Sequence, residues 1–457
     1  MDKVKIFQKL PGPIKSLIAS YRGFQLKSLR TLNRAQYLQE ISARDTWSKQ
    51  EIYDFQKQKC REILDHAKKN VPYYRQVWEV IHAKDPSIDH LELSNWPILE
   101  KDAIRNNPDD FIADGYNKRD LTHIQTSGTS GKPMSIYFDR YTISYWYAMY
   151  EHRIRNWNHV SENDRWANIG GQLICDVNRN KPPFWTWNSV MRQLYLSSYH
   201  ITPENTIHYL NAFKKYKIKY LLGYVSSLYN LANEALKNGL EIPKFSVIIT
   251  IAEPLYEHQK IVIEKAFQCK AIQTYSSSEL IFGSNENEEG KMYIWPEAGM
   301  VEVVDSNNTI HSSGTGELLT TGFLNKAMPL IRYRLGDTVK INKNKTGLLN
   351  YDTFDEIIGR TDDMIVTTEG KLVGRLDPIF KADLNIKESQ IIQEDYNRFT
   401  INVVKDKHFS EKDTASIESR LKDRVGNNVQ VNFEYLDTIP RGANGKFKAV
   451  ISKVKRS

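Results

Sequence analysis

The chain has 457 residues, 40% of them hydrophobic and 11% aromatic, and its formal net charge is +8. This length and composition are ordinary for a globular protein of two or more domains with sizeable cores. No run of about 18 uncharged apolar residues occurs and the N-terminus lacks the apolar core of a signal peptide, so no membrane-spanning segment is predicted and we expect a cytoplasmic protein.

The N-terminal segment holds almost all of the excess positive charge. Residues 1–34 contain eight Lys or Arg residues and a single acid, Asp2. Apolar residues are interspersed with these charges, so the segment could lie on an anionic membrane surface as a peripheral contact. A solvated, partly packed helix is the alternative that stays open. Nucleic acid is not predicted as a partner, because no recognition motif accompanies the charge. We assign residues 1–48 as a basic N-terminal helical segment.

The three cysteines, Cys60, Cys175 and Cys269, lie far apart in the sequence and form no CxxC spacing. Neither a disulfide framework nor a zinc motif is therefore predicted. We expect reduced and mostly buried thiols.

The next part of the chain begins with a helical pattern. From Lys49 to about Val80, apolar residues recur mostly at three- and four-residue steps, which predicts a helical entry segment. Between Leu121 and Asp139, an apolar lead-in, a glycine-rich loop and the alternating stretch SIYF follow one another. This order predicts a loop that joins two strands.

Later stretches alternate between strand and helix. KYLLGY, FSVIITIAE and KAIQTYSSSE each read as a strand ending in polar or small residues, and VSSLYNLANEALKNG and LYEHQKIVIEKAFQ read as helices between them. This alternation predicts an α/β sheet with a ligand site at its carboxyl edge. Past Gly290, short strands with Gly and Asn turns predict a mostly antiparallel subdomain. After Arg360 the signals fit a small α+β unit, so we predict a large domain, 49–359, and a small C-terminal lid domain, 360–457.

The loop 126-TSGTSGKP-133 combines glycines, small hydroxyl residues and one lysine. It is not a Walker P-loop, because only two residues separate its glycines and Pro133 occupies the place of the metal-binding hydroxyl. Its backbone N–H groups could still approach a phosphate closely, with added hydroxyl donors and a mobile positive charge. A flexible polar hairpin is the alternative. The candidate phosphate-binding residues are Thr126, Ser127, Gly128, Thr129, Ser130, Gly131 and Lys132.

Six further stretches complete the pattern, in the order 223-GYVSSL-228, 252-AEPL-255, 275-YSSSE-279, 328-MPLIRYRLGD-337, 359-GRTDDM-364 and 439-IPRGANGKFKAV-450. Together with the glycine loop they resemble the adenylate-forming superfamily of acyl-CoA synthetases, peptide-synthetase adenylation domains and luciferases. Their wording is most similar to the phenylacetate-CoA ligase branch and its relatives encoded with capsular polysaccharide genes. The resemblance implies an α/β fold with mixed sheets, flanking helices and an antiparallel subdomain in a large N-terminal domain, and a small mobile α+β C-terminal domain.

The resemblance also implies roles for residues at the predicted strand ends. Tyr275 would stack on an adenine face, and Glu279 would offer a hard oxygen ligand to a magnesium ion that bridges ATP phosphates. Alone, each stretch could be an ordinary strand-end turn. The implied acyl-pocket residues are Gly223 and Tyr224, and the implied nucleotide-binding residues are Ala252, Glu253, Pro254, Tyr275, Ser276, Ser277 and Ser278.

Four more roles follow from the resemblance. Asp337 would accept hydrogen bonds from both ribose hydroxyls, a task that suits a carboxylate. Arg360 would lie near the ribose or the α-phosphate, and Asp362 would be the pivot about which the C-terminal domain turns. Lys446 would neutralise charge at the α-phosphorus while the substrate carboxylate displaces pyrophosphate.

These assignments imply a ligase that uses ATP and Mg²⁺ to form an acyl-adenylate. The acyl group would then pass to CoA, or to an amine or hydroxyl, for example on a sugar used in surface polysaccharide biosynthesis. A non-catalytic nucleotide-binding or membrane-docking protein with the same fold is the alternative class. The presence of Glu279, Asp337 and Lys446 argues against that alternative.

Two features leave the acceptor and the acid open. Many CoA ligases carry an Arg-Gly loop after the hinge, whereas this chain reads 366-VTTEGKLVGRLDP-378, in which Glu369 is an awkward neighbour for a thiolate. The region between Tyr141 and Trp187 is rich in aromatic residues, which could line a pocket for an aryl or sugar-like acid or could belong to the core. These residues are Tyr145, Trp146, Tyr147, Trp157, Trp166, Trp185 and Trp187.

Overall fold

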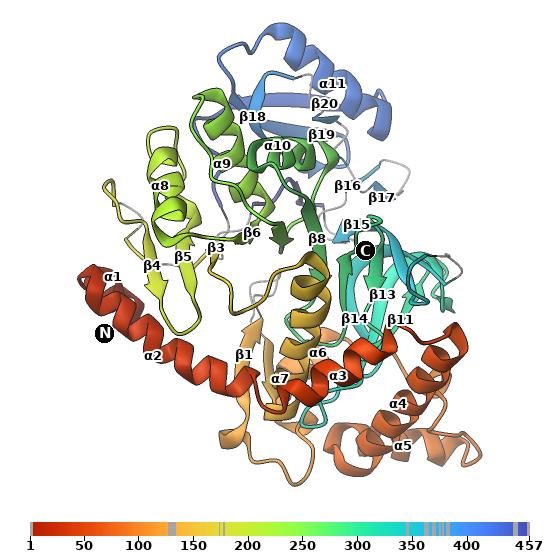
Figure 1. The fold of residues 1–457 in the computed structure, drawn as a ribbon. Helices are drawn as coiled ribbons and strands as arrows, with labels where there is room; N and C mark the ends of the chain where they lie inside the picture. The colour runs from red at the N-terminus through yellow and green to blue at the C-terminus, as the bar shows by residue number, and fades with distance from the viewer. Residues whose placement is uncertain are drawn as a thin grey trace.

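The computed structural model describes residues 3–126, 134–172, 174–176, 179–343, 347–360, 365–367, 372–373, 376, 379–380, 384–441 and 447–454. A large body carries a smaller unit, made of the last strands and α11, above the ends of its central strands (Figure 1). The α-helices of the described residues are α1 (Lys3–Lys9), α2 (Gly12–Arg30), α3 (Arg34–Arg44), α4 (Lys49–Asn70), α5 (Pro72–Lys84), α6 (Lys101–Asn106), α7 (Arg140–Met149), α8 (Thr206–Tyr216), α9 (Val225–Lys237), α10 (Glu257–Phe267) and α11 (Glu411–Val425).

The strands of the described residues form one large sheet and three small ones. The large sheet has thirteen strands in the order β12-β11-β13-β14-β15-β10-β9-β8-β7-β6-β3-β5-β4. The strands are β1 (Thr122–Thr126), β2 (Met134–Phe138), β3 (Trp166–Gly170), β4 (Trp185–Asn188), β5 (Gln193–Ser197), β6 (Tyr220–Tyr224), β7 (Ile248–Ile251), β8 (Ala271–Ser276), β9 (Gly283–Glu286), β10 (Met292–Ile294), β11 (Gly299–Val304), β12 (Ile310–His311), β13 (Gly314–Gly322), β14 (Tyr333–Asn342), β15 (Thr353–Arg360), β16 (Ile365–Val366), β17 (Leu372–Val373), β18 (Ile386–Asp395), β19 (Arg398–Lys405), β20 (Gln430–Tyr435) and β21 (Val450–Ser452).

The parallel part of the large sheet consists of β5, β3, β6, β7 and β8. The predicted strands and helices of this part are confirmed: β6, β7 and β8 are joined through α9 and α10. Apolar residues on the helices, such as Leu228, Leu231 and Ile263, are buried in a cluster with strand residues, which is why these segments stack as βαβ units. The strands stay in register, with Gly223 opposite Thr250 and Thr250 opposite Gln273.

The antiparallel part runs from β9 to β15, as the Gly- and Asn-rich turns after Gly290 predicted. It is continuous with the parallel part, because β9 pairs antiparallel with β8. The sequence patterns indicated the strands but not that one sheet contains both parts. The predicted α/β class with a large mixed sheet is confirmed.

The small C-terminal sheet has the strand order β20-β19-β18-β21 and packs against α11. Its core contains buried residues from both layers, among them Ile391, Phe399, Ile417 and Leu421. Ser410 caps α11 through a reciprocal pair of contacts with Asp413, which fixes where the helix begins. The predicted small α+β unit at the C-terminus is therefore confirmed.

The predicted helical segment from Lys49 to about Val80 is confirmed and consists of two helices, α4 and α5. Ser48 and Glu51 form a capping box at the start of α4. The chain turns at Val71, and Pro72 opens α5, because a proline lacks the backbone N–H needed inside a helix but fits its first turn. Apolar residues keep their three- and four-residue spacing across this break, so the spacing alone did not predict the turn.

The cysteines and the aromatic cluster fall mainly in the core. Cys60 and Cys175 are buried, Cys269 is half-buried and all three are free thiols, as predicted. Burial raises the pKa of the Cys60 and Cys269 thiols to about 12. Of the aromatic residues between Tyr141 and Trp187, Tyr145, Trp146 and Trp166 belong to a buried cluster, so these three are core residues and not a substrate lining.

Candidate active site

The predicted site residues gather at one edge of the parallel strands. Gly223 and Tyr224 close β6, Ala252 directly follows β7, and Tyr275 and Ser276 close β8. Because these strands are parallel neighbours in register, their carboxyl ends lie side by side. This is the edge at which open α/β sheets bind ligands.

The backbone at this edge takes rare conformations. Ala252 has φ = 67° and Leu280, next to Glu279, has φ = 55°, both in the left-handed region that non-glycine residues seldom adopt. At Gly223, an added Cβ would lie 3.0 Å from the carbonyl oxygen of Ile169, so a larger residue would require β6 and β3 to move slightly apart. Strained backbone of this kind concentrates at functional sites.

Tyr275 and Asp337 form the first polar pair of the site. The Tyr275 hydroxyl donates to Oδ2 of Asp337 at 2.8 Å. The Tyr275 ring meets Phe282 and Phe354 edge-on, with centroids 4.8 and 5.3 Å away. The backbone of Asp337 pairs with that of Arg360 on the next strand. Strands far apart in sequence thus fix the Asp337 carboxylate beside the predicted adenine position.

Glu279 and Tyr333 form the second pair. The Tyr333 hydroxyl donates to Oε1 of Glu279 at 3.1 Å, and Glu279 is only 7% exposed. The same hydroxyl lies 3.9 Å from the sulfur of Met134, which follows the glycine loop. Thr126 and Met134 pair across β1 and β2, so these strands bring both ends of the loop together as predicted. Glu279 therefore lies close to the base of the loop. Tyr333 had no assigned role in the sequence, although it stands within the same motif as Asp337.

The turn after β8 suits a magnesium ion that is held mainly by phosphate oxygens. The Ser277 hydroxyl is buried and has no hydrogen-bond partner among the described residues, so this turn contains a donor that a ligand could satisfy. No group of three or more His, Cys, Asp or Glu side chains forms a metal cage in the described part of the chain. A lone carboxylate such as Glu279 matches magnesium sites in which substrate phosphates supply further ligands.

Glu253 links the site to the C-terminal unit. Its Oε2 accepts from the backbone N–H of Ser226 at 2.7 Å, at the start of α9, where the helix dipole favours a carboxylate. Its Oε1 accepts from the Ser226 hydroxyl at 3.1 Å and from the backbone N–H of Phe447 at 2.9 Å. Burial raises the pKa of Glu253, although the hydrogen bonds from Ser226 and Phe447 oppose the shift.

Further polar contacts hold the C-terminal unit against α9. Asn230 donates to Oε1 of Glu388 at 2.7 Å, and Lys237 pairs with Asp406. Glu388 also pairs with Arg441, whose guanidinium lies 4.6 Å from the centroid of the Phe447 ring. Arg441 and Phe447 are the residues on either side of positions 442–446. The two ends of the lysine segment are thereby held together near β7.

Several predicted site residues fall outside the described residues, namely Ser127, Gly128, Thr129, Ser130, Gly131, Lys132, Asp362 and Lys446. The side chains of Thr126 and Arg360 lie outside them as well. The sequence assigned no role to Arg332 or Arg334, and both pair with carboxylates of the large sheet: Arg332 with Glu302, and Arg334 with Glu317.

Two cavities differ in their relation to this site. One, of about 250 Å³, lies between α9, α10 and the C-terminal sheet, and its lining includes Ser226, Tyr229, His258, Lys387 and Phe447. It borders Ser226 and Phe447, the two hydrogen-bond partners of Glu253, and therefore lies next to the candidate site.

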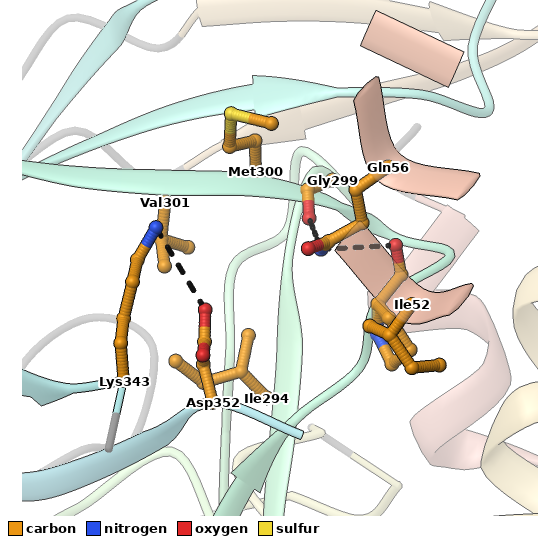
Figure 2. A pocket seen from close by; sticks show the side chains of 9 residues that line it. Ile52, Gln56, Ile294, Gly299, Met300, Val301, Lys343 and Asp352 are labelled. Carbon is orange, nitrogen blue, oxygen red and sulfur yellow. Dashed lines mark hydrogen bonds and ion pairs between the residues drawn. The ribbon is translucent and has the colours of Figure 1, made fainter. Parts of the chain in front are cut away.

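The other cavity, of about 10 Å³, lies between α4 and the antiparallel strands (Figure 2). Figure 2 shows Lys343 and Asp352 pointing toward one another, 3.9 Å apart, beside it. Its volume is that of one water molecule, and none of its lining residues was predicted in the site. We exclude it as a substrate pocket.

Sequence comparisons identify related proteins. Residues 365–453 match the family model of the CapK C-terminal domain. The chain is 28% identical to Protein CapK of Staphylococcus aureus over 414 residues, which cover 89% of this chain and 90% of the relative. It is 23% identical to the phenylacetate-coenzyme A ligase of Pseudomonas putida over 338 residues, which cover 70% and 73% of the two chains.

Structural comparison finds the same fold in solved acyl-CoA ligases. A 2-hydroxyisobutyryl-CoA ligase in its postadenylation state, complexed with R3-HIB-AMP, has a TM-score of 0.68 at 17% identity, covering 90% of this chain and 91% of that one. The same ligase in its thioesterification state gives 0.54 at equal coverage. The resemblance predicted from the sequence motifs is therefore confirmed, because the chain is a homologue of CapK and a relative of the phenylacetate-CoA ligases of the adenylate-forming superfamily.

Proposed function

We propose that this protein is an ATP-dependent ligase that activates a carboxylic acid as its acyl-adenylate and then transfers the acyl group to an acceptor. The observation that carries this proposal is the contact between Glu253 and Phe447. It holds the segment next to Lys446 over the strand edge that also carries the Tyr275–Asp337 and Tyr333–Glu279 pairs. A nucleotide held by that edge would face Lys446.

In the first step, an oxygen of the substrate carboxylate attacks the α-phosphorus of ATP. The bond between that phosphorus and the bridging oxygen breaks, and pyrophosphate leaves with its electron pair. Backbone N–H groups and hydroxyls of the loop from Thr126 to Gly131 hold the β- and γ-phosphates, and Lys132 assists. Asp337 orients the ribose, with Arg360 near the ribose or the α-phosphate. The charge that develops at phosphorus needs a fixed positive partner, which Lys446 supplies.

Glu279 would hold a magnesium ion together with phosphate oxygens, and bound there the ion would neutralise phosphate charge. Tyr333 keeps the Glu279 carboxylate in place through its hydrogen bond. The adenine would lie between Tyr275 and the segment of Ala252, Glu253 and Pro254. The Glu253 carboxylate accepts hydrogen bonds from the backbone N–H groups of Ser226 and Phe447. Its part in this step is therefore to position the segment that contains Lys446.

In the second step, a thiol, amine or hydroxyl attacks the acyl carbonyl carbon, and AMP leaves. We propose that the C-terminal unit first turns about Asp362, which withdraws Lys446 and admits the acceptor. This turn requires the Glu253–Phe447 and Asn230–Glu388 contacts to break. The cavity of about 250 Å³ beside Phe447 would then offer an entry route, whether the acceptor is CoA or an amine or hydroxyl of a sugar in surface polysaccharide biosynthesis.

The domain boundaries stay a proposal, with a helical segment at 1–48, the large domain at 49–359 and the lid at 360–457. The acyl group would lie near Gly223 and Tyr224. Among the described residues no helix is long and apolar enough to cross a membrane. We propose a cytoplasmic enzyme, with contact to the inner membrane face through a surface remote from this site.

Acid-dependent exchange of labelled pyrophosphate into ATP, across a panel of carboxylic acids, tests the first step. We expect exchange with at least one acid and none without acid. Silence across a broad panel, with ATP binding intact, would favour a non-catalytic nucleotide-binding or membrane-docking protein. Acid-dependent consumption of free CoA thiol then separates CoA from amine and hydroxyl acceptors.

A further inference from the structure

Helix α2 carries an apolar stripe on its outer face. Ile14, Leu17, Ile18, Tyr21 and Phe24 recur at three- and four-residue steps, so they share one side of the helix. Their exposed fractions run from 42% to 71%. Seven of the sixteen large hydrophobic side chains that are exposed in the described residues fall within residues 6–32, so the stripe is not ordinary surface composition.

The opposite face of α2 is the one that packs on the protein. Gly23 is buried, and an added Cβ there would collide with the Asn188 side chain of the edge strand β4. The Ser20 hydroxyl accepts from the backbone N–H of Ser189 at 3.0 Å. Lys15 is buried and donates to the carbonyl oxygen of Gln8 at 2.8 Å. These contacts fix the rotation of the helix, so the apolar stripe is held outward.

The charge around the stripe is of one sign. Residues 3–39 contain eight Lys or Arg residues and no Asp or Glu. Arg34 is neutralised by Glu151 and Glu162 of the body. Lys9 and Arg22 are exposed beside the stripe. In Figure 1, α1 and α2 run along one margin of the molecule, away from the C-terminal unit, so a flat surface could approach them.

We propose that α1 and α2 dock the protein on an anionic lipid bilayer. The stripe enters the boundary between headgroups and acyl chains, while the flanking basic side chains contact lipid phosphates. The charged residues that flank the stripe are all positive, so they favour a partner whose surface is uniformly anionic. An anionic bilayer meets this requirement better than a protein surface does. This docking is independent of the ligase activity, since no residue of the stripe belongs to the candidate active site.

Co-sedimentation of the full-length protein with vesicles tests the docking. We expect binding to phosphatidylcholine vesicles that contain phosphatidylglycerol, little binding to pure phosphatidylcholine, and weaker binding at high salt. The double variant Leu17→Ser, Phe24→Ser should bind the anionic vesicles about tenfold more weakly or worse. The matched control is Ile207→Ser, Ile261→Ser, which removes two exposed apolar side chains from α8 and α10 and should bind as the parent does.

Thermal melts of both variants show whether the fold is kept, which we expect because all four side chains are exposed. The proposal is overturned if the parent protein ignores anionic vesicles or binds neutral ones equally. It also fails if the control pair loses as much binding as the stripe pair. A dimer in light scattering that only the stripe variant dissociates, without vesicle binding, would identify a second copy of this chain as the occupant instead.

Discussion

The two sides of the candidate site are held by different kinds of structure. On the nucleotide side, Tyr333 is fully buried and Glu279 nearly so, and their hydrogen bond forms inside the packed large sheet. On the lysine side, the Glu253–Phe447 bond and the Lys237–Asp406 ion pair cross from one folded unit to another. Polar contacts across such an interface can be exchanged for contacts with water at little net cost. Folding therefore fixes the first side, which we call the permanent side. The contacts of the second side would have to break in the turn proposed about Asp362, so we call it the detachable side.

The largest effect should come from Lys446 itself. We expect Lys446→Ala to lower pyrophosphate exchange about a hundredfold or more, because it would remove the cation that we propose stabilises charge at the α-phosphorus. The matched control is Lys448→Ala, two residues along the same segment, which should retain exchange. Equal exchange rates in the Lys446 variant and the parent would show that the lysine has no part in adenylation.

Asp337 tests the permanent side. We expect Asp337→Ala to raise the KM for ATP about tenfold or more, since a hydrogen bond from a ribose hydroxyl to a carboxylate is lost. Tyr275→Phe should have a smaller effect of the same kind, and the double variant should be less than additive because the two side chains are bonded. The control is Asp305→Ala, at an exposed turn remote from the site. An unchanged KM for ATP in the Asp337 variant would contradict the ribose assignment.

Glu253 tests the detachable side. Glutamine offers one acceptor oxygen where the carboxylate offers two, so Glu253→Gln should weaken the bond to Phe447 or to Ser226. We expect adenylation about tenfold slower with little change in the KM for ATP, and transfer from a supplied acyl-adenylate near the parent rate. Glu257→Gln, exposed on α10, is the control. If transfer from the adenylate slowed as much as adenylation, Glu253 would have a general structural role instead.

The raised pKa of Glu253 gives a pH dependence of definite sign. Its carboxyl is protonated more readily in the folded chain than in the unfolded one, where the pKa is about 4.5. The stabilisation linked to this proton is complete below pH 4.5 and is lost as the pH rises through the raised pKa. We expect the free energy of unfolding of the parent, relative to Glu253→Gln, to fall over this range. Parallel curves for the two proteins would contradict the shift.

The smallest effect should come from the Lys237–Asp406 pair. Both partners lie near the surface, where an ion pair contributes about 1 kcal/mol or less. We expect Lys237→Ala to change adenylation by about fivefold or less. Lys422→Ala, which breaks an ion pair within α11, is the matched control. A loss as large as that in Glu253→Gln would show that charge, and not the buried carboxylate, holds the C-terminal unit in place.

Local patterns predicted much of the fold and the position of the site. Strands such as Ile248–Ile251 and helices such as α9 followed from periodicity, and motif positions after β7 and β8 placed the site at the carboxyl edge. The partners of the site residues could not be predicted in this way. Glu253 meets Phe447 194 residues later, and Tyr275 meets Asp337 62 residues later. Such pairs depend on the order of the strands in the sheet and on how the two units dock. Local sequence patterns predict neither of these.

Local patterns also could not tell whether an apolar residue lies in the core or at a surface or ligand pocket. Trp146 and Trp166 fit a ligand pocket and a core equally well by composition, and only the packing of the sheet assigned them to the core. On α2, the apolar residues were visible in the sequence, but their outward direction depends on the contact of Gly23 with β4.

Helix α2 packs against β4, at one edge of the large sheet. β4 is the last strand of the large sheet, and an open edge presents unpaired backbone groups that can template pairing with another chain. Helix α2 contacts β4, and the backbone N–H of Ser189, next to the end of this strand, donates to the Ser20 hydroxyl of the helix. We therefore expect α2 to hinder a second chain from adding a strand there. We thus expect the helix that carries the exposed apolar stripe to shield this edge of the sheet as well. This second role would not require a membrane.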